Sequence, residues 1–92
     1  MSIAADDWRL MNAEHLRGLS FELKPYQRWS ENWDHDHCAA CFAKFAQTDV
    51  SEDALHVGWA AGEDHPHGAA YDWICEDCFS ELSVVLGWRI VS

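Results

Sequence analysis

The sequence has few basic residues. Its 92 residues include six lysines and arginines against sixteen aspartates and glutamates, giving a formal net charge of −10 at pH 7. Binding to a phosphate backbone depends on basic side chains that displace counterions, so this composition argues against nucleic acid as a direct ligand. A strongly acidic domain is steered toward basic protein surfaces, and the alternative is a charged coat that only confers solubility. We therefore expect a protein partner, and a basic one.

Long apolar segments are also missing. No run approaches the ~20 apolar residues needed to cross a bilayer, so we predict no membrane association. Residues 1–8 contain neither the basic region nor the apolar segment of a secretory signal, and we expect a cytoplasmic protein. The sequence also contains no glycine-rich phosphate loop and no Ser/His/Asp order. These absences favour a binding protein over an enzyme.

The four cysteines form two C-x-x-C pairs, Cys38 with Cys41 and Cys75 with Cys78, and none is left over. A tetrahedral Zn²⁺ takes four thiolates, and two residues between ligands let one tight turn present both sulfurs. The 33 residues between the pairs exceed the roughly 15 to 20 of the commonest spacing, so this segment should hold structure of its own. We predict one structural Zn²⁺ bound by all four cysteines. Disulfides in an oxidising compartment and a thioredoxin-like redox pair remain alternatives.

A run of aspartate and histidine, residues 34–37, directly precedes Cys38. His35 or His37 can replace a cysteine as a zinc ligand, hydrogen-bond the thiolates, or bind a second, catalytic metal. Because four cysteines already fill a closed site, we favour contacts to the thiolates or a solvated surface for both histidines.

The length suits a single small domain, 1–92, whose limited core a structural metal supplements. Residues 1–34 are expected to form an N-terminal extension. It contains a helix over 6–17, capped by one of two aspartates and ended by Gly18, and a strand over 19–24, stopped by Pro25. Residues 25–36 give no regular pattern.

The zinc-bearing part is expected to span residues 35–92. We predict two strands that form a hairpin and a following helix, over residues 55–60, 71–74 and 76–86. Gly58 is expected to mark a bulge in the first strand, and Gly87 to end the helix. Residues 42–46 fit a short strand or a turn of helix equally well, and residues 88–91 form a strand-like tail.

This order places the first cysteine pair on a turn and the second at the amino end of a helix. It resembles the treble-clef zinc finger, within the broader zinc-ribbon-like Cys₄ proteins, over about residues 35–88. A group of small bacterial zinc-binding proteins of unassigned function is also similar, through Trp33-Asp34-His35-Asp36-His37-Cys38-x-x-Cys41 and Trp73-Ile74-Cys75-x-x-Cys78-Phe79. The resemblance implies an α+β fold built around structural zinc, and it implies no activity.

The functional hypothesis is a small acidic adaptor or inhibitor, of which an immunity protein that neutralises a toxin is one form. The first alternative is a metal-dependent hydrolase of the HNH type, which would use the two histidines before Cys38 together with Asp64, His65 and His67. Only nine residues separate His65 from Cys75, which is short for an HNH finger. The second alternative is a zinc-stabilised structural subunit of a larger assembly.

Overall fold

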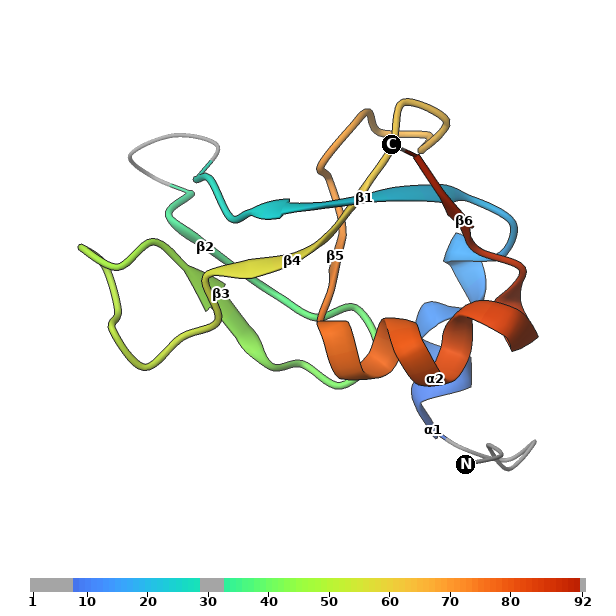
Figure 1. The fold of residues 1–92 in the computed structure, drawn as a ribbon, viewed down its shortest axis with the longest axis horizontal. Coiled ribbons are helices and arrows are strands. Elements are labelled where there is room, and N and C mark those ends of the chain that lie inside the picture. The colour runs from blue at the N-terminus through green and yellow to red at the C-terminus, as the bar shows by residue number, and fades with distance from the viewer. Residues whose placement is uncertain (1–7, 29–32, 92) are drawn as a thin grey trace.

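The computed structural model describes residues 8–28 and 33–91, which form a small α+β fold with two sheets (Figure 1). The helical elements are α1 (Trp8–Ala13), the 3₁₀ turn η1 (Glu14–Leu16) and α2 (Glu76–Leu86). The strands are β1 (Ser20–Pro25), β2 (His35–His37), β3 (Lys44–Ala46), β4 (Val57–Ala61), β5 (Trp73–Ile74) and β6 (Arg89–Ile90).

The first helix, predicted over residues 6–17, ends earlier than expected. Its α-helical part ends at Ala13, and η1 continues to Leu16. The aspartates expected to cap it lie outside the described residues. Gly18 follows with φ 78°, and its N–H donates to the Leu86 carbonyl at 2.8 Å. The left-handed turn that glycine permits therefore places the end of η1 against the end of α2.

The larger sheet has the strand order β5-β4-β1-β6. Strands β4 and β5 pair antiparallel, which confirms the predicted hairpin, although β5 is only two residues long. The strand-like tail is also confirmed, because β6 pairs parallel with β1. Strand β1 lies between β4 and β6, so the N-terminal extension is part of the same sheet as the hairpin.

Strands β2 and β3 form a separate antiparallel hairpin, with His35 opposite Ala46 and His37 opposite Lys44. Residues 44–46 are therefore strand, which settles the choice that the sequence left open. The prediction of irregular structure over residues 25–36 was wrong at both ends. Pro25, expected to stop the strand, is paired with Val57 in β1, and residues 35 and 36 pair in β2. Three polar residues in a row carry no alternating pattern, so the pairing had no signal in the sequence.

The Gly58 bulge was also wrong. The register of β1 with β4 runs without an extra residue from Phe21–Ala61 through Lys24–Gly58. A Cβ at Gly58 would lie 2.4 Å from Cε1 of the buried Phe45 ring. The glycine is needed because an aromatic ring packs directly on the backbone.

Aromatic side chains cover both faces of the larger sheet. On one face, Phe79 of α2 stacks on Trp59 with ring centroids 4.0 Å apart and meets Phe21 edge-on at 5.9 Å. On the other face, Trp73 packs against Tyr26 at 4.8 Å and against Phe45 at 5.6 Å. Helix α2 and the β2–β3 hairpin thus enclose the sheet from opposite sides.

The tryptophans are divided between core and surface. Trp73 and Trp88 are buried, whereas Trp8 and Trp33 are 53% and 42% exposed. Trp29 lies outside the described residues. Within the described part of the chain, no helix is long and apolar enough to cross a membrane.

Candidate metal centre

The fold brings the two C-x-x-C pairs together. Cys38 directly follows β2, Cys41 lies in the turn before β3, Cys75 follows β5, and Cys78 lies in the first turn of α2. Their four Sγ atoms all lie within 4.8 Å of one another. These four cysteines can therefore bind a metal ion.

The first pair lies on a tight turn. The Cys38 N–H donates to the Ala43 carbonyl at 2.7 Å, and the Phe42 N–H donates to the Cys38 carbonyl at 2.9 Å. Phe42 closes the turn with φ 67°, a left-handed conformation that favours glycine. The Ala39 N–H donates to the Trp73 carbonyl at 2.9 Å, which joins this turn to β5 and so to the second pair.

The second pair opens helix α2. Cys75 is the N-cap residue, and its Sγ accepts a hydrogen bond from the Cys78 N–H at 3.5 Å. The Cys75 N–H donates to the Cys38 sulfur at 3.3 Å. Backbone N–H groups and the positive end of a helix dipole both favour thiolate over thiol, so this arrangement suits metal-bound cysteines.

The protons of the cluster are unevenly distributed. Hydrogen bonds from the Cys75 and Cys78 side chains strongly lower the pKa of Cys38. The hydrogen bond with Cys38 and, to a smaller extent, burial raise the pKa of Cys75 to about 12. Hydrogen bonds with Cys38 and Cys75 raise the pKa of Cys78. Without a cation, ionisation of the Cys38 thiol therefore opposes ionisation of the Cys75 and Cys78 thiols.

Helix α1 closes one side of this centre. Arg9 places its Nη1 3.9 Å from the Cys78 sulfur and 2.8 Å from Oε2 of Glu81, and Asn12 donates to the Ala40 carbonyl at 2.9 Å. Both C-x-x-C turns are thus joined to the same helix. The sequence carries no signal for Arg9 or Asn12, because their partners Cys78 and Ala40 lie 69 and 28 positions away in the chain.

The histidines before Cys38 lie apart from the cysteine cluster. His35 and His37 are exposed on β2, and Nδ1 of His35 lies 3.0 Å from Oδ1 of Asp34. The hydrogen bond with His35 lowers the pKa of the Asp34 carboxyl. Neither histidine belongs to the group of side chains able to share one metal ion.

Asp36 contributes to the fold instead. Its carboxylate accepts hydrogen bonds from the Tyr26 hydroxyl at 2.6 Å and from the Trp33 indole N–H at 3.1 Å. Burial and the bond to Asp36 raise the pKa of Tyr26, which therefore stays a neutral donor.

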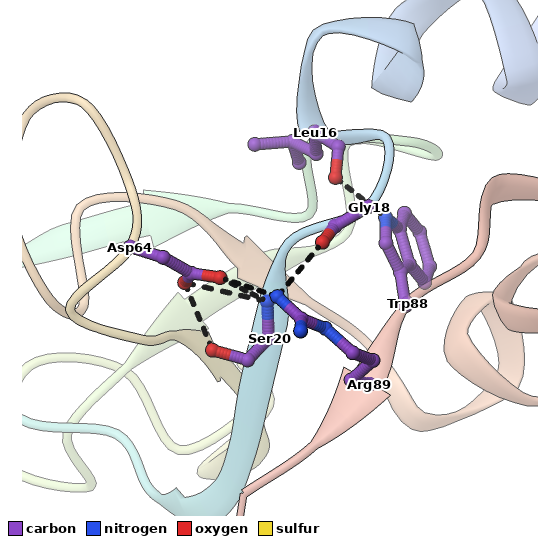
Figure 2. A network of polar contacts seen from close by, with 6 residues as sticks. All are labelled: Leu16, Gly18, Ser20, Asp64, Trp88 and Arg89. Carbon is purple, nitrogen blue, oxygen red and sulfur yellow. Dashed lines mark hydrogen bonds and ion pairs between the residues drawn. The ribbon is translucent and has the colours of Figure 1, made fainter.

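Asp64 belongs to a polar network that joins three segments (Figure 2). Its carboxylate accepts hydrogen bonds from the Ser20 N–H at 3.0 Å and the Ser20 hydroxyl at 2.8 Å, and pairs with Arg89 at 3.2 Å. Burial opposes ionisation of Asp64, but the bonds from Ser20 and the charge of Arg89 outweigh it and lower the pKa. The network ties the loop after β4 to β1 and β6.

His65 and His67 have structural contacts in the same loop. The buried His65 places Nε2 2.7 Å from Oδ2 of Asp72, and its Nδ1 accepts the His67 N–H at 2.9 Å. Both imidazole rings pack on Tyr71, at 5.1 and 4.7 Å. In residues 8–28 and 33–91, the four cysteines are the group of three or more side chains placed to hold a metal. The residues of the hydrolase alternative do not converge on such a group.

Comparisons with protein-family models, curated proteins and solved structures found no match to this chain.

Proposed function

We propose that the cysteine cluster is a structural zinc site, with Cys38, Cys41, Cys75 and Cys78 as its ligands. The proximity of the four sulfurs, all within 4.8 Å, is the observation that carries this proposal. Four soft thiolates in a closed, largely buried cluster favour Zn²⁺ over Mg²⁺ or Ca²⁺, which prefer oxygen ligands. The ion would join β2, β3, β5 and α2 at one point.

The order of elements supports assignment to the treble-clef class. A hairpin turn supplies the first pair, the β4–β5 hairpin follows, and α2 supplies the second pair from its first turn. The bulk of the chain outside this unit, α1 and β1, packs onto it and completes its sheet.

The biochemical role we propose is that of a cytoplasmic adaptor or inhibitor that binds a basic protein, with an immunity protein as one form. Support comes from the net charge of −10 and from exposed apolar side chains next to the metal centre. Trp8 stacks on Phe42 at 6.0 Å, and Trp8, Met11 and Phe42 are 53%, 78% and 60% exposed. Exposed aromatic side chains on a charged surface are typical anchors of protein interfaces.

The zinc proposal is tested by metal content. Native mass spectrometry of the purified protein should show one zinc per chain. Cys78→Ser should abolish stoichiometric zinc, because it removes a ligand. The matched control, His35→Ala with His37→Ala, should retain one zinc. Zinc in the Cys78→Ser variant at wild-type stoichiometry, or its loss in the histidine control, would contradict the ligand set.

The binding role is tested by affinity capture. The zinc-loaded protein should capture a specific protein of basic isoelectric point at low salt, and less of it at moderate salt, because salt screens charge attraction. Recovery of nucleic acid, or of no protein, would sink the proposal.

A further inference from the structure

A groove opens beside the cysteine cluster, with a volume of about 500 Å³. Three of the four cysteines line it, and the apolar part of its wall comes from Ala43, Leu55 and Val57. Its size falls within the range of protein sites that bind small ligands or side chains.

The apolar wall is open to solvent. Leu55 is 39% exposed and Val57 is 41% exposed. Covering such side chains stabilises a complex by about 25 cal/mol per Å² of apolar surface removed from water. This side of the groove therefore favours an aliphatic chain.

The first two turns of α2 also line the groove, and they are acidic. Glu76 and Asp77 are exposed there, and Glu81 pairs with Arg9 at 2.8 Å. Three carboxylates against one guanidinium leave a net charge of −2 on the groove. A Zn²⁺ bound by four thiolates would add a further charge of −2 at the groove, which three of the cysteines line. The groove thus combines an aliphatic wall with an attraction for cations.

We propose that this groove binds a lysine or arginine side chain of the protein partner, presented beside an apolar residue. The aliphatic stem packs on Leu55 and Val57, and the cationic head lies against the carboxylates of Glu76 and Asp77. Both long basic side chains have this division between an apolar stem and a charged end. We expect the groove to exclude an acidic segment of a partner protein, because its negative charge would be repelled by the carboxylates and thiolates. The inference deepens the binding role proposed above and rests on it.

The test uses the zinc-loaded full chain and a displayed library of random linear peptides. Enriched sequences should carry lysine or arginine next to a large aliphatic residue. A synthetic peptide of the enriched sequence is then measured by fluorescence anisotropy. Glu76→Gln with Asp77→Asn should weaken its binding at least tenfold. The matched control, Glu22→Gln with Glu63→Gln, removes two exposed carboxylates that line a different hollow and should change binding less than twofold.

Two further arms separate contact from misfolding. Val57→Lys places a positive charge on the apolar wall of the groove. It should weaken peptide binding at least tenfold, while zinc content and circular dichroism stay unchanged. Replacing the basic residue of the peptide by norleucine should lower the affinity of the wild-type protein at least tenfold. The Glu76→Gln/Asp77→Asn variant should bind this norleucine peptide with the same affinity as the wild type.

Enrichment of acidic or neutral peptides, or no enrichment, would overturn the groove assignment. Equal losses of peptide affinity in the groove and control variants, or a dimer formed through the groove in analytical ultracentrifugation, would overturn it as well.

These outcomes differ from failure of the binding role itself. If a captured partner binds the groove variants with wild-type affinity, the binding role stands and the groove is wrong. If capture yields no protein but the basic peptide depends on Glu76 and Asp77, the groove stands and the role is wrong.

Discussion

At the scale of single residues, two features depend on close contacts: the glycine at position 58 and the ionisation of the cysteine thiols. Gly58 has ordinary strand pairing, yet its missing side chain is what lets the Phe45 ring approach the backbone. In the cysteine cluster, the pKa of Cys38 is lowered and the pKa values of Cys75 and Cys78 are raised, so ionisation of Cys38 opposes ionisation of the other two. Both effects involve contacts between residues distant in the chain, Gly58 with Phe45 and Cys38 with Cys75.

Gly58→Ala should destabilise the zinc-loaded protein by about 1–3 kcal/mol, because the added methyl overlaps a buried ring. Urea unfolding followed by tryptophan fluorescence measures this free energy. Phe45→Leu makes room at the same place, so the double variant should lose less stability than the sum of the two single variants. A Gly58→Ala protein as stable as the wild type would show that the ring moves away at no cost.

Zinc affinity should rise with pH. The pKa values of Cys75 and Cys78 are raised, so both thiols are protonated at neutral pH in the metal-free cluster, and zinc must displace both protons. The lowered pKa of Cys38 means that its proton has already left. The logarithm of the apparent association constant should therefore increase by about two or more per pH unit from pH 6 to 8. Chelator competition, corrected for the chelator's own protonation, measures it, and a flat profile would refute the proton count.

At the scale of elements, α1 packs against the candidate metal centre and contacts both of its C-x-x-C turns. Arg9 contacts the Cys78 sulfur from one end of the helix, and Asn12 holds the turn of the first pair from the other. A guanidinium next to a thiolate offsets part of the negative charge of a Cys₄ centre. The N-terminal extension thus contributes to the metal environment as well as to the sheet.

Arg9→Gln should therefore accelerate zinc transfer to a chelator and lower zinc affinity roughly tenfold, because partners of metal ligands contribute about 10- to 100-fold. The matched control is Arg17→Gln. Arg17 is exposed on the same N-terminal segment and pairs with Glu14 at 2.8 Å. The control should exchange zinc at the wild-type rate. Equal rates in all three proteins would show that the Arg9 contact has no effect on the metal.

At the scale of the whole molecule, the cysteine cluster joins both sheets to α2. Cys38 forms an isolated parallel bridge with Trp73, which links the small hairpin to the larger sheet, and Cys75 connects that sheet to the helix. Structural zinc contributes apparent binding free energies of about 10–16 kcal/mol, comparable to the entire stability of an ordinary domain. Removal of the metal should therefore affect the whole fold.

Chelation should unfold at least the chain after Asn32. Far-ultraviolet circular dichroism should lose its helical signal, and the thermal transition should broaden or disappear until zinc is restored. The circular dichroism and the melting temperature are compared among three samples: protein alone, protein with chelator, and protein with chelator and excess zinc. An apo protein with unchanged circular dichroism and melting temperature would show that the core is sufficient without metal.

The sequence by itself determined the features that depend on near neighbours. The C-x-x-C spacing predicted two turns able to present paired sulfurs, and the four cysteines do lie together. The apolar periodicity ending at Gly87 predicted α2 as Glu76–Leu86, and the alternation on either side of the loop after β4 predicted the β4–β5 hairpin. The turns, the helix and the individual strands each depend on residues within a few positions of one another, where steric and hydrogen-bonding preferences act directly.

Only the tertiary structure decided which of these elements meet. It placed β1 between β4 and β6, paired the polar residues of β2 with β3, and brought Arg9 to Cys78. It also engaged Asp64 and His65, two residues of the hydrolase alternative, in contacts that hold the loop. The physical reason is that long-range contacts are selected by packing the whole core at once, so no short stretch of sequence contains the information.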